Sequence, residues 1–243
     1  MARGSGYGIS IVTFIVLAAV FLSVSMAPHA STVNTMFGIV IVHFLRMAAF
    51  LVSGVLLLVV HCKYGAAAQH IAQTSSHFVE AVAVAGVYIF IVGVIVTSIS
   101  TTILSALLLN SEACIGRHQA HATLYSIAYV VYSPFKIIFV VGLCTFVHTY
   151  RLRAFSNSRF VRLSIVVTFG SILWLYLDTE VAWSKAIENE LPSFDCFTPE
   201  LKEMAELNRQ IYIYFFPFVC EFCLVVCEAL VRLFFQVQGT NIH

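Results

Sequence analysis

The chain has 243 residues, of which 60% are hydrophobic and only 10% are charged. Soluble domains average about 45–50% apolar and about 25% charged residues. This composition and a mean hydropathy of +0.93 exclude an ordinary soluble domain and indicate an integral membrane protein. A net charge of +1 gives no indication of a nucleic-acid partner.

Six stretches are long and apolar enough to cross a bilayer as helices, because about 20 apolar residues span the hydrocarbon core. Short polar segments separate them, so we expect an all-α membrane protein with a single six-helix domain over residues 1–243. The predicted spans are 9–26, 37–60, 79–109, 123–150, 163–183 and 210–235.

The first span also has features of a secretory signal peptide. Arg3 precedes an apolar core that ends in small residues near Ser25. Pro28 would stand at or beside the cleavage point, where proline is unfavourable. We therefore favour a retained helix, and cleavage stays the alternative.

The distribution of lysine and arginine predicts the orientation, because cytoplasmic loops are enriched in these residues. With the N-terminus inside, the cytoplasmic side receives Arg3, Lys63, Arg151, Arg153, Arg159, Arg162 and Arg232. The outside receives Arg117, Lys185, Lys202 and Arg209. Both termini are therefore expected in the cytoplasm, in a multi-pass protein of the cell membrane.

This orientation places Cys114 and Cys196 in two different extracellular loops. Disulfides persist in that compartment. A Cys114–Cys196 disulfide is our hypothesis, and two free thiols are the alternative.

The last predicted span carries Glu221 near its middle and Pro217 one helical turn earlier. A carboxylate at mid-membrane depth costs about 2.5–3.5 kcal/mol on insertion scales, so it normally faces protein or water. Glu221 is thus either a structural hydrogen-bonding group or a titratable group on an ion path.

Other charged residues lie at several depths of the predicted spans. Lys136 has about the same depth as Glu221, and an ion pair between them would reduce the cost of burying both. We expect a second polar layer in the outer half of the predicted spans. Glu221 and Glu228 are seven residues apart and should share one face of the last span. The outer layer consists of His43, Arg46 and Asp178, and His148 lies towards the inner end of its span.

Signatures of enzymes and metal sites are weak. His118 and His121 have helical spacing but no carboxylate near them in a metal-ligand pattern. Cys220, Cys223 and Cys227 are read as packing residues. We predict neither catalytic residues nor a metal site nor a cofactor.

Three features together resemble the otopetrin family of proton channels. The segment Asn157-Ser-Arg-Phe160, followed by Arg162 to Trp174, resembles the family's turn before helix five and the helix itself. The segment from Tyr214 to Leu224 is similar to the family's Pro-x-x-x-Glu-Tyr-Ser-Leu motif in helix six. The arrangement of six spans with an acidic segment before the last also agrees.

The resemblance implies a proton-selective channel opened by extracellular acid. Family members have twelve helices in two halves and assemble as dimers, so this chain corresponds to one half. It would then be a fragment, a short isoform or a half-sized relative that assembles as more copies.

Residue by residue, Glu221 matches the family's helix-six glutamate. The family's glutamate near the outer end of helix five falls at Glu180 or Val181, depending on the register, and Glu180 is the natural candidate. His148 aligns loosely with a polar residue late in helix four. Two polar positions of the family are replaced here. The helix-five asparagine falls at Phe169 or Gly170, and the helix-three glutamate is lost.

The function expected from the residues and the resemblance is proton conduction across the membrane on extracellular acidification. The proton path is expected to use His43, Arg46, Lys136, His148, Asp178, Glu180, Glu221 and Glu228. Its partners are protons, membrane lipid and either further copies of the chain or a second six-helix half. The alternative is a non-conducting structural or regulatory subunit that pairs with a full-length channel.

Overall fold

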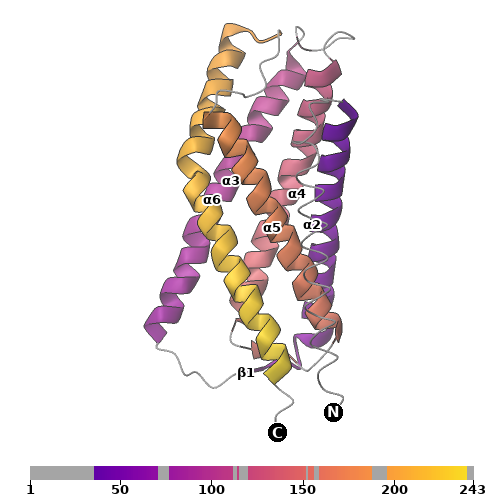
Figure 1. The fold of residues 1–243 in the computed structure, drawn as a ribbon, viewed down its shortest axis with the longest axis vertical. Coiled ribbons are helices and arrows are strands. Elements are labelled where there is room, and N and C mark those ends of the chain that lie inside the picture. Colours follow the sequence, from indigo (N-terminus) through magenta and orange to yellow (C-terminus); the bar gives the residue numbers. More distant parts are fainter. Residues whose placement is uncertain are drawn as a thin grey trace.

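The structure is a computed structural model that describes residues 36–70, 77–111, 114, 120–151, 153–155, 159–187 and 196–239. Five long helices make up almost all of this part of the chain (Figure 1). They are α2 (Met36–Tyr64), α3 (His77–Asn110), α4 (Ala120–Tyr150), α5 (Arg159–Ile187) and α6 (Pro199–Gly239). The predicted span 9–26 lies outside the described residues.

Four of the described helices are long and apolar enough to cross a membrane. The candidate spans are Ile41–Tyr64, Ala85–Asn110, Thr123–Tyr150 and Arg159–Ser184, and α6 is not among them. The expectation of an all-helical, membrane-embedded protein is therefore confirmed at this coarse level.

Helix α6 begins eleven residues before the predicted start at Gln210. Thr198 caps it, since its hydroxyl accepts a hydrogen bond from the backbone N–H of Leu201 at 3.4 Å. Pro199 suits the first helical position, where its missing N–H would have had no partner in the helix. The predicted span 210–235 thus lies within a longer helix, whose charged first part was not predicted to be helical because it lacks the apolar composition of a span.

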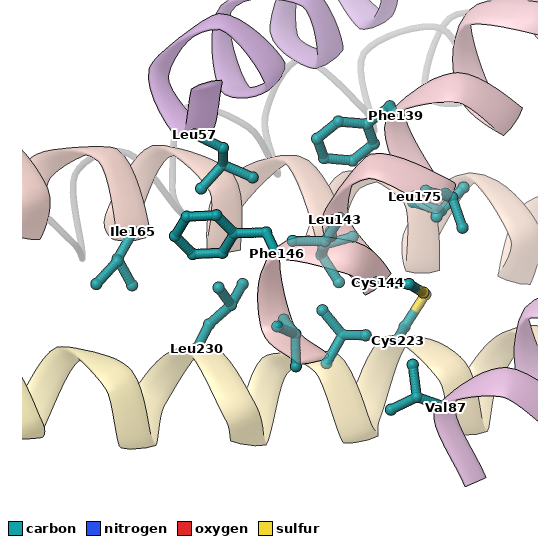
Figure 2. Packing of buried hydrophobic residues seen from close by; sticks show 14 of the residues in the cluster. Leu57, Val87, Phe139, Leu143, Cys144, Phe146, Ile165, Leu175, Cys223 and Leu230 are labelled. Carbon is teal, nitrogen blue, oxygen red and sulfur yellow. The ribbon is translucent and has the colours of Figure 1, made fainter. Parts of the chain in front are cut away.

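The five described helices form a closed bundle in which each helix packs against two neighbours. Going round the bundle, the order is α2, α4, α3, α6, α5 and back to α2. Apolar side chains fill the interior over much of its length, as Figure 2 shows for Leu143, Phe146 and Leu230. Burial of these side chains on every helix holds the bundle together by close packing.

Different cross-connections tie the two ends of the bundle. At one end, a disulfide joins Cys114, between α3 and α4, to Cys196, before α6, with 5.0 Å between their Cα atoms. At the other end, strand β1 (Gln69–His70) pairs antiparallel with β2 (Arg153–Ala154). These two ends are called the disulfide end and the strand end below.

Candidate functional site

The most polar part of the described interior lies in the half of the bundle near the disulfide end. Its centre is an ion pair between α2 and α5, in which Arg46 Nη2 lies 2.6 Å from Asp178 Oδ1. The two side chains are 5% and 17% exposed. Because isolated charges are costly in a low-dielectric interior, each requires the other.

Aromatic side chains of α4 surround this ion pair. The Tyr132 hydroxyl donates a long hydrogen bond of 3.5 Å to Asp178 Oδ2, the carboxylate oxygen that does not face Arg46 Nη2. The His43 ring packs edge-on against Tyr129 and Tyr132, with centroid distances of 4.5 and 5.3 Å. Both oxygens of Asp178 therefore have a protein partner.

Helices α3 and α6 continue the polar lining on the other side of the bundle. The hydroxyls of Thr101 and Tyr212 are hydrogen-bonded at 3.1 Å, and Ser100 donates to Asn208 Oδ1 at 2.7 Å. Tyr212 is close enough to Tyr129 and Asp178 to interact with them electrostatically. The polar cluster thus draws on all five described helices, and we define it as His43, Arg46, Thr101, Tyr129, Tyr132, Asp178, Asn208 and Tyr212.

Lys136 lies one helical turn from Tyr132, on the side of the polar cluster that faces the strand end. Its side chain is only 5% exposed, and its charge interacts with those of Asp178 and Arg46. No described carboxylate is within ion-pair distance of it. Lys136 therefore places a second buried cation at the inner boundary of the cluster.

Beyond Lys136 large apolar side chains fill most of the interior, together with the small buried hydroxyl residues Ser164, Thr168 and Ser171 of α5. Phe50 of α2 stacks on Phe139 of α4 with ring centroids 4.7 Å apart. Leu143, Phe146 and Leu230 continue the packing towards the strand end (Figure 2). We call these five residues the apolar block.

The apolar block has polar groups at its edge and beyond it. Ser53 and Ser171 are hydrogen-bonded to each other at 2.7 Å between α2 and α5. At the strand end, His61 Nδ1 lies 2.8 Å from the Tyr150 hydroxyl. The apolar block thus separates the polar cluster from this His61–Tyr150 pair.

The structure separates the predicted path residues into two groups. His43, Arg46 and Asp178, predicted as one polar layer, lie together, and Lys136 lies next to them. The remaining residues lie elsewhere: Glu180 is half-buried near Cys220, His148 is exposed beside Tyr88, and Glu221 and Glu228 are exposed on α6.

The predicted Lys136–Glu221 ion pair is wrong. Helix α6 turns Cys223, which is 1% exposed, towards Lys136. Glu221 precedes Cys223 by two positions, about 200° around the helix, and therefore points away from the interior. Similar depth in the membrane did not bring these two side chains onto facing sides of their helices.

The outward side of α6 has a regular pattern. Exposed residues recur at intervals of three and four, and Glu228 forms a hydrogen-bonded ion pair with Arg232 four positions later. We define the α6 outer face as Tyr214, Pro217, Glu221, Leu224, Glu228, Arg232 and Phe235. The predicted sharing of one face by Glu221 and Glu228 is thus confirmed, although that face looks out of the bundle.

Sequence reasoning missed the tyrosines of the polar cluster. Tyr125, Tyr129 and Tyr132 lie at intervals of four and three on one face of α4, and the rings of the first two are 4.6 Å apart. This heptad-like spacing of hydroxyl-bearing aromatics was the available signal. No group of three potential metal ligands occurs among the described residues.

Comparisons of the chain with protein-family models, with curated proteins and with solved structures found no match. The resemblance to otopetrins therefore rests on the sequence motifs alone.

Proposed function

We propose that this chain is one half of an otopetrin-like proton channel in the cell membrane and that external acid drives protons inward through it. The observation that supports this best is the polar cluster around the Arg46–Asp178 ion pair. Carboxylates and histidines buried at membrane depth are typical of proton relays, and here tyrosine hydroxyls lie beside them. The cluster also lies at the end of the bundle where acid would arrive.

The proposed orientation has six crossings and both termini in the cytoplasm, with 9–26 and α6 as the two further spans. The disulfide between Cys114 and Cys196 supports an extracellular position for that end, because such bonds persist in oxidising compartments. The arginines between α4 and α5 support a cytoplasmic position for the strand end.

In this proposal the apolar block is a closed gate. Hydrophobic constrictions stop conduction by excluding water. Protons then reach Asp178 and Lys136 from outside but need a hydrated path past Leu143 to reach the His61–Tyr150 pair. Conduction therefore requires the bundle to open at the level of Phe139 and Leu143.

The α6 outer face supports the view that the chain is one half of a larger assembly. Glu221 is exposed near the middle of α6, and a carboxylate facing lipid at that depth is unfavourable. A second six-helix unit over this face would remove Glu221 from lipid. Glu221 and Glu228 would then line the boundary between two units, as a second possible path.

Proton flux into liposomes that contain only this chain is the decisive measurement. With the membrane potential clamped by potassium and valinomycin and a pH-sensitive dye inside, we expect acid influx on external acidification. The interior path predicts that Leu143→Ser, which adds a hydroxyl to the apolar block, raises the flux. Glu221→Gln leaves the flux unchanged if protons use the interior and lowers it if they use the boundary between units.

The alternative is a non-conducting subunit, and the apolar block is the observation that favours it. A subunit of this kind gives no acid influx alone at any external pH, and Leu143→Ser does not create any. It restores or modifies flux only when reconstituted with a full-length channel.

A further inference from the structure

The strand end concentrates positive charge where two helices leave the membrane. The candidate span Thr123–Tyr150 ends and the candidate span Arg159–Ser184 begins there. Lys63 lies in the last turn of α2 at the same end. Together Lys63, Arg151, Arg153, Arg159 and Arg162 form what we call the basic cluster.

No carboxylate is available within the segments that form the basic cluster. The sequence contains no aspartate or glutamate from His61 to His77 or from Tyr150 to Arg162. On the neighbouring part of α6, Glu228 is already paired with Arg232. Five cations therefore lie at one end of the bundle in segments that contain no aspartate or glutamate, which makes this end attractive to an external anion.

Tertiary contacts fix the position of Arg153 in this cluster. The β1–β2 pairing sets Arg153 opposite His70 and so fastens the α4–α5 connection to the α2–α3 connection. The guanidinium carbon of Arg153 lies 5.8 Å from the centroid of the Tyr150 ring. The attraction between the guanidinium and the ring face restricts where the Arg153 side chain can lie.

Two arginines of the cluster carry buried donors that need a partner. The Nε atoms of Arg153 and Arg162 are buried, and neither has a hydrogen-bond acceptor among the described residues. A buried donor without an acceptor is unfavourable, so these atoms indicate a missing group that accepts hydrogen bonds. Both belong to half-buried side chains, unlike the exposed Lys63 and Arg159.

We propose that the basic cluster binds the phosphate group of an anionic membrane lipid, held by Arg153 and Arg162. Phosphate offers several acceptor oxygens and matches the fork of a guanidinium. Clusters of four to eight basic residues at the cytoplasmic end of membrane helices are typical of sites for anionic lipid headgroups. Lipid is favoured over free phosphate because the cluster lies directly at the ends of two candidate spans.

This proposal does not depend on proton conduction, and it can be tested by binding alone. The full-length chain is titrated with fluorescent phosphatidic acid in mixed micelles of phosphatidylcholine and a neutral detergent. The double variant Arg153→Gln/Arg162→Gln is compared with Lys63→Gln/Arg159→Gln, which removes the same charge from exposed positions. Gel filtration and circular dichroism establish that each variant is folded.

We expect Arg153→Gln/Arg162→Gln to weaken lipid binding by roughly tenfold or more, because each lost charge-assisted hydrogen bond has a large effect on affinity. The matched control should change binding only slightly. Arg153→Lys, which keeps the charge but loses the fork, should bind with intermediate affinity.

Three outcomes would overturn the proposal. Equal losses in the two double variants would show unspecific attraction to a charged surface. Full competition by millimolar inorganic phosphate would show a soluble anion as the ligand. Binding of phosphatidylcholine as tight as that of phosphatidic acid would show that the net negative charge of the headgroup is not recognised.

Discussion

Replacing Asp178 by asparagine removes the negative charge of the polar cluster while nearly preserving the size of the side chain. Arg46, which is 5% exposed, is then left as a buried cation without its carboxylate. Breaking a buried ion pair by neutralising one partner costs about 3–5 kcal/mol. Since Asp178 keeps 17% exposure, we expect the lower end of this range, about 3 kcal/mol.

The size of the chain sets the corresponding thermal shift. For 150–250 residues, a change of 1 kcal/mol in the free energy of unfolding shifts the melting temperature by about 2–4 °C. Asp178→Asn should therefore lower the melting temperature by about 6–12 °C. Thermal unfolding followed by intrinsic fluorescence in a neutral detergent measures this shift.

The double variant Arg46→Gln/Asp178→Asn provides the control, because it removes both charges of the ion pair. Replacing a buried ion pair by neutral groups is often neutral or stabilising, so the double variant should melt at a higher temperature than Asp178→Asn. A double variant that melts no higher than the single one would refute the reasoning. So would an Asp178→Asn variant as stable as the original chain.

Three further predictions concern the fold. A Cβ at Gly93 would lie 2.4 Å from Cβ of Phe218, so Gly93→Ala should push α3 and α6 apart and lower the melting temperature. Gly142→Ala is the control: nothing lies within 4 Å of a Cβ there, and the melting temperature should not fall. Cys114→Ser removes a disulfide between residues 82 positions apart in the sequence. In the chain-entropy model this should lower the free energy of unfolding by up to about 4–5 kcal/mol. Mass shifts after alkylation, with and without reductant, test whether the bond is present. Thr198→Ala removes the cap of α6 and should cost about 1 kcal/mol, measured by thermal unfolding, and an unchanged melting temperature would contradict the capping role.

Length and hydropathy were sufficient to predict helices α2 to α5, because long apolar runs with few charges have few alternatives to a membrane helix. They failed for the first eleven residues of α6. That part carries Glu206 and Arg209, which form an exposed ion pair at the helix surface. Hydrogen bonds from the side chains of Arg209 and Gln210 lower the pKa of the Glu206 carboxyl, as expected for a carboxylate paired in water. Only the Thr198-Pro199 cap signal marked the start of this helix.

The polar cluster was partly predictable because counting residues along a span gives depth. His43, Arg46 and Asp178 were placed in one layer on that basis, and they do lie together. Depth does not give the direction in which a side chain points. The rotation of α6 depends on which of its faces packs best, and the face with Val219, Cys223 and Val226 is apolar and fully enclosed.

The rotation of α6 has a consequence for the assembled protein. In a membrane, the exterior of a bundle faces hydrocarbon, so ionisable groups should turn inward. Asp178 points into the bundle and is paired with Arg46, whereas Glu221 points outward from the middle of α6. The predicted first span, 9–26, contains no basic residue that could neutralise Glu221. A second unit that shields Glu221 from lipid would therefore keep the Glu221 carboxylate, like that of Asp178, out of contact with hydrocarbon. We expect this unit to pack on the α6 outer face.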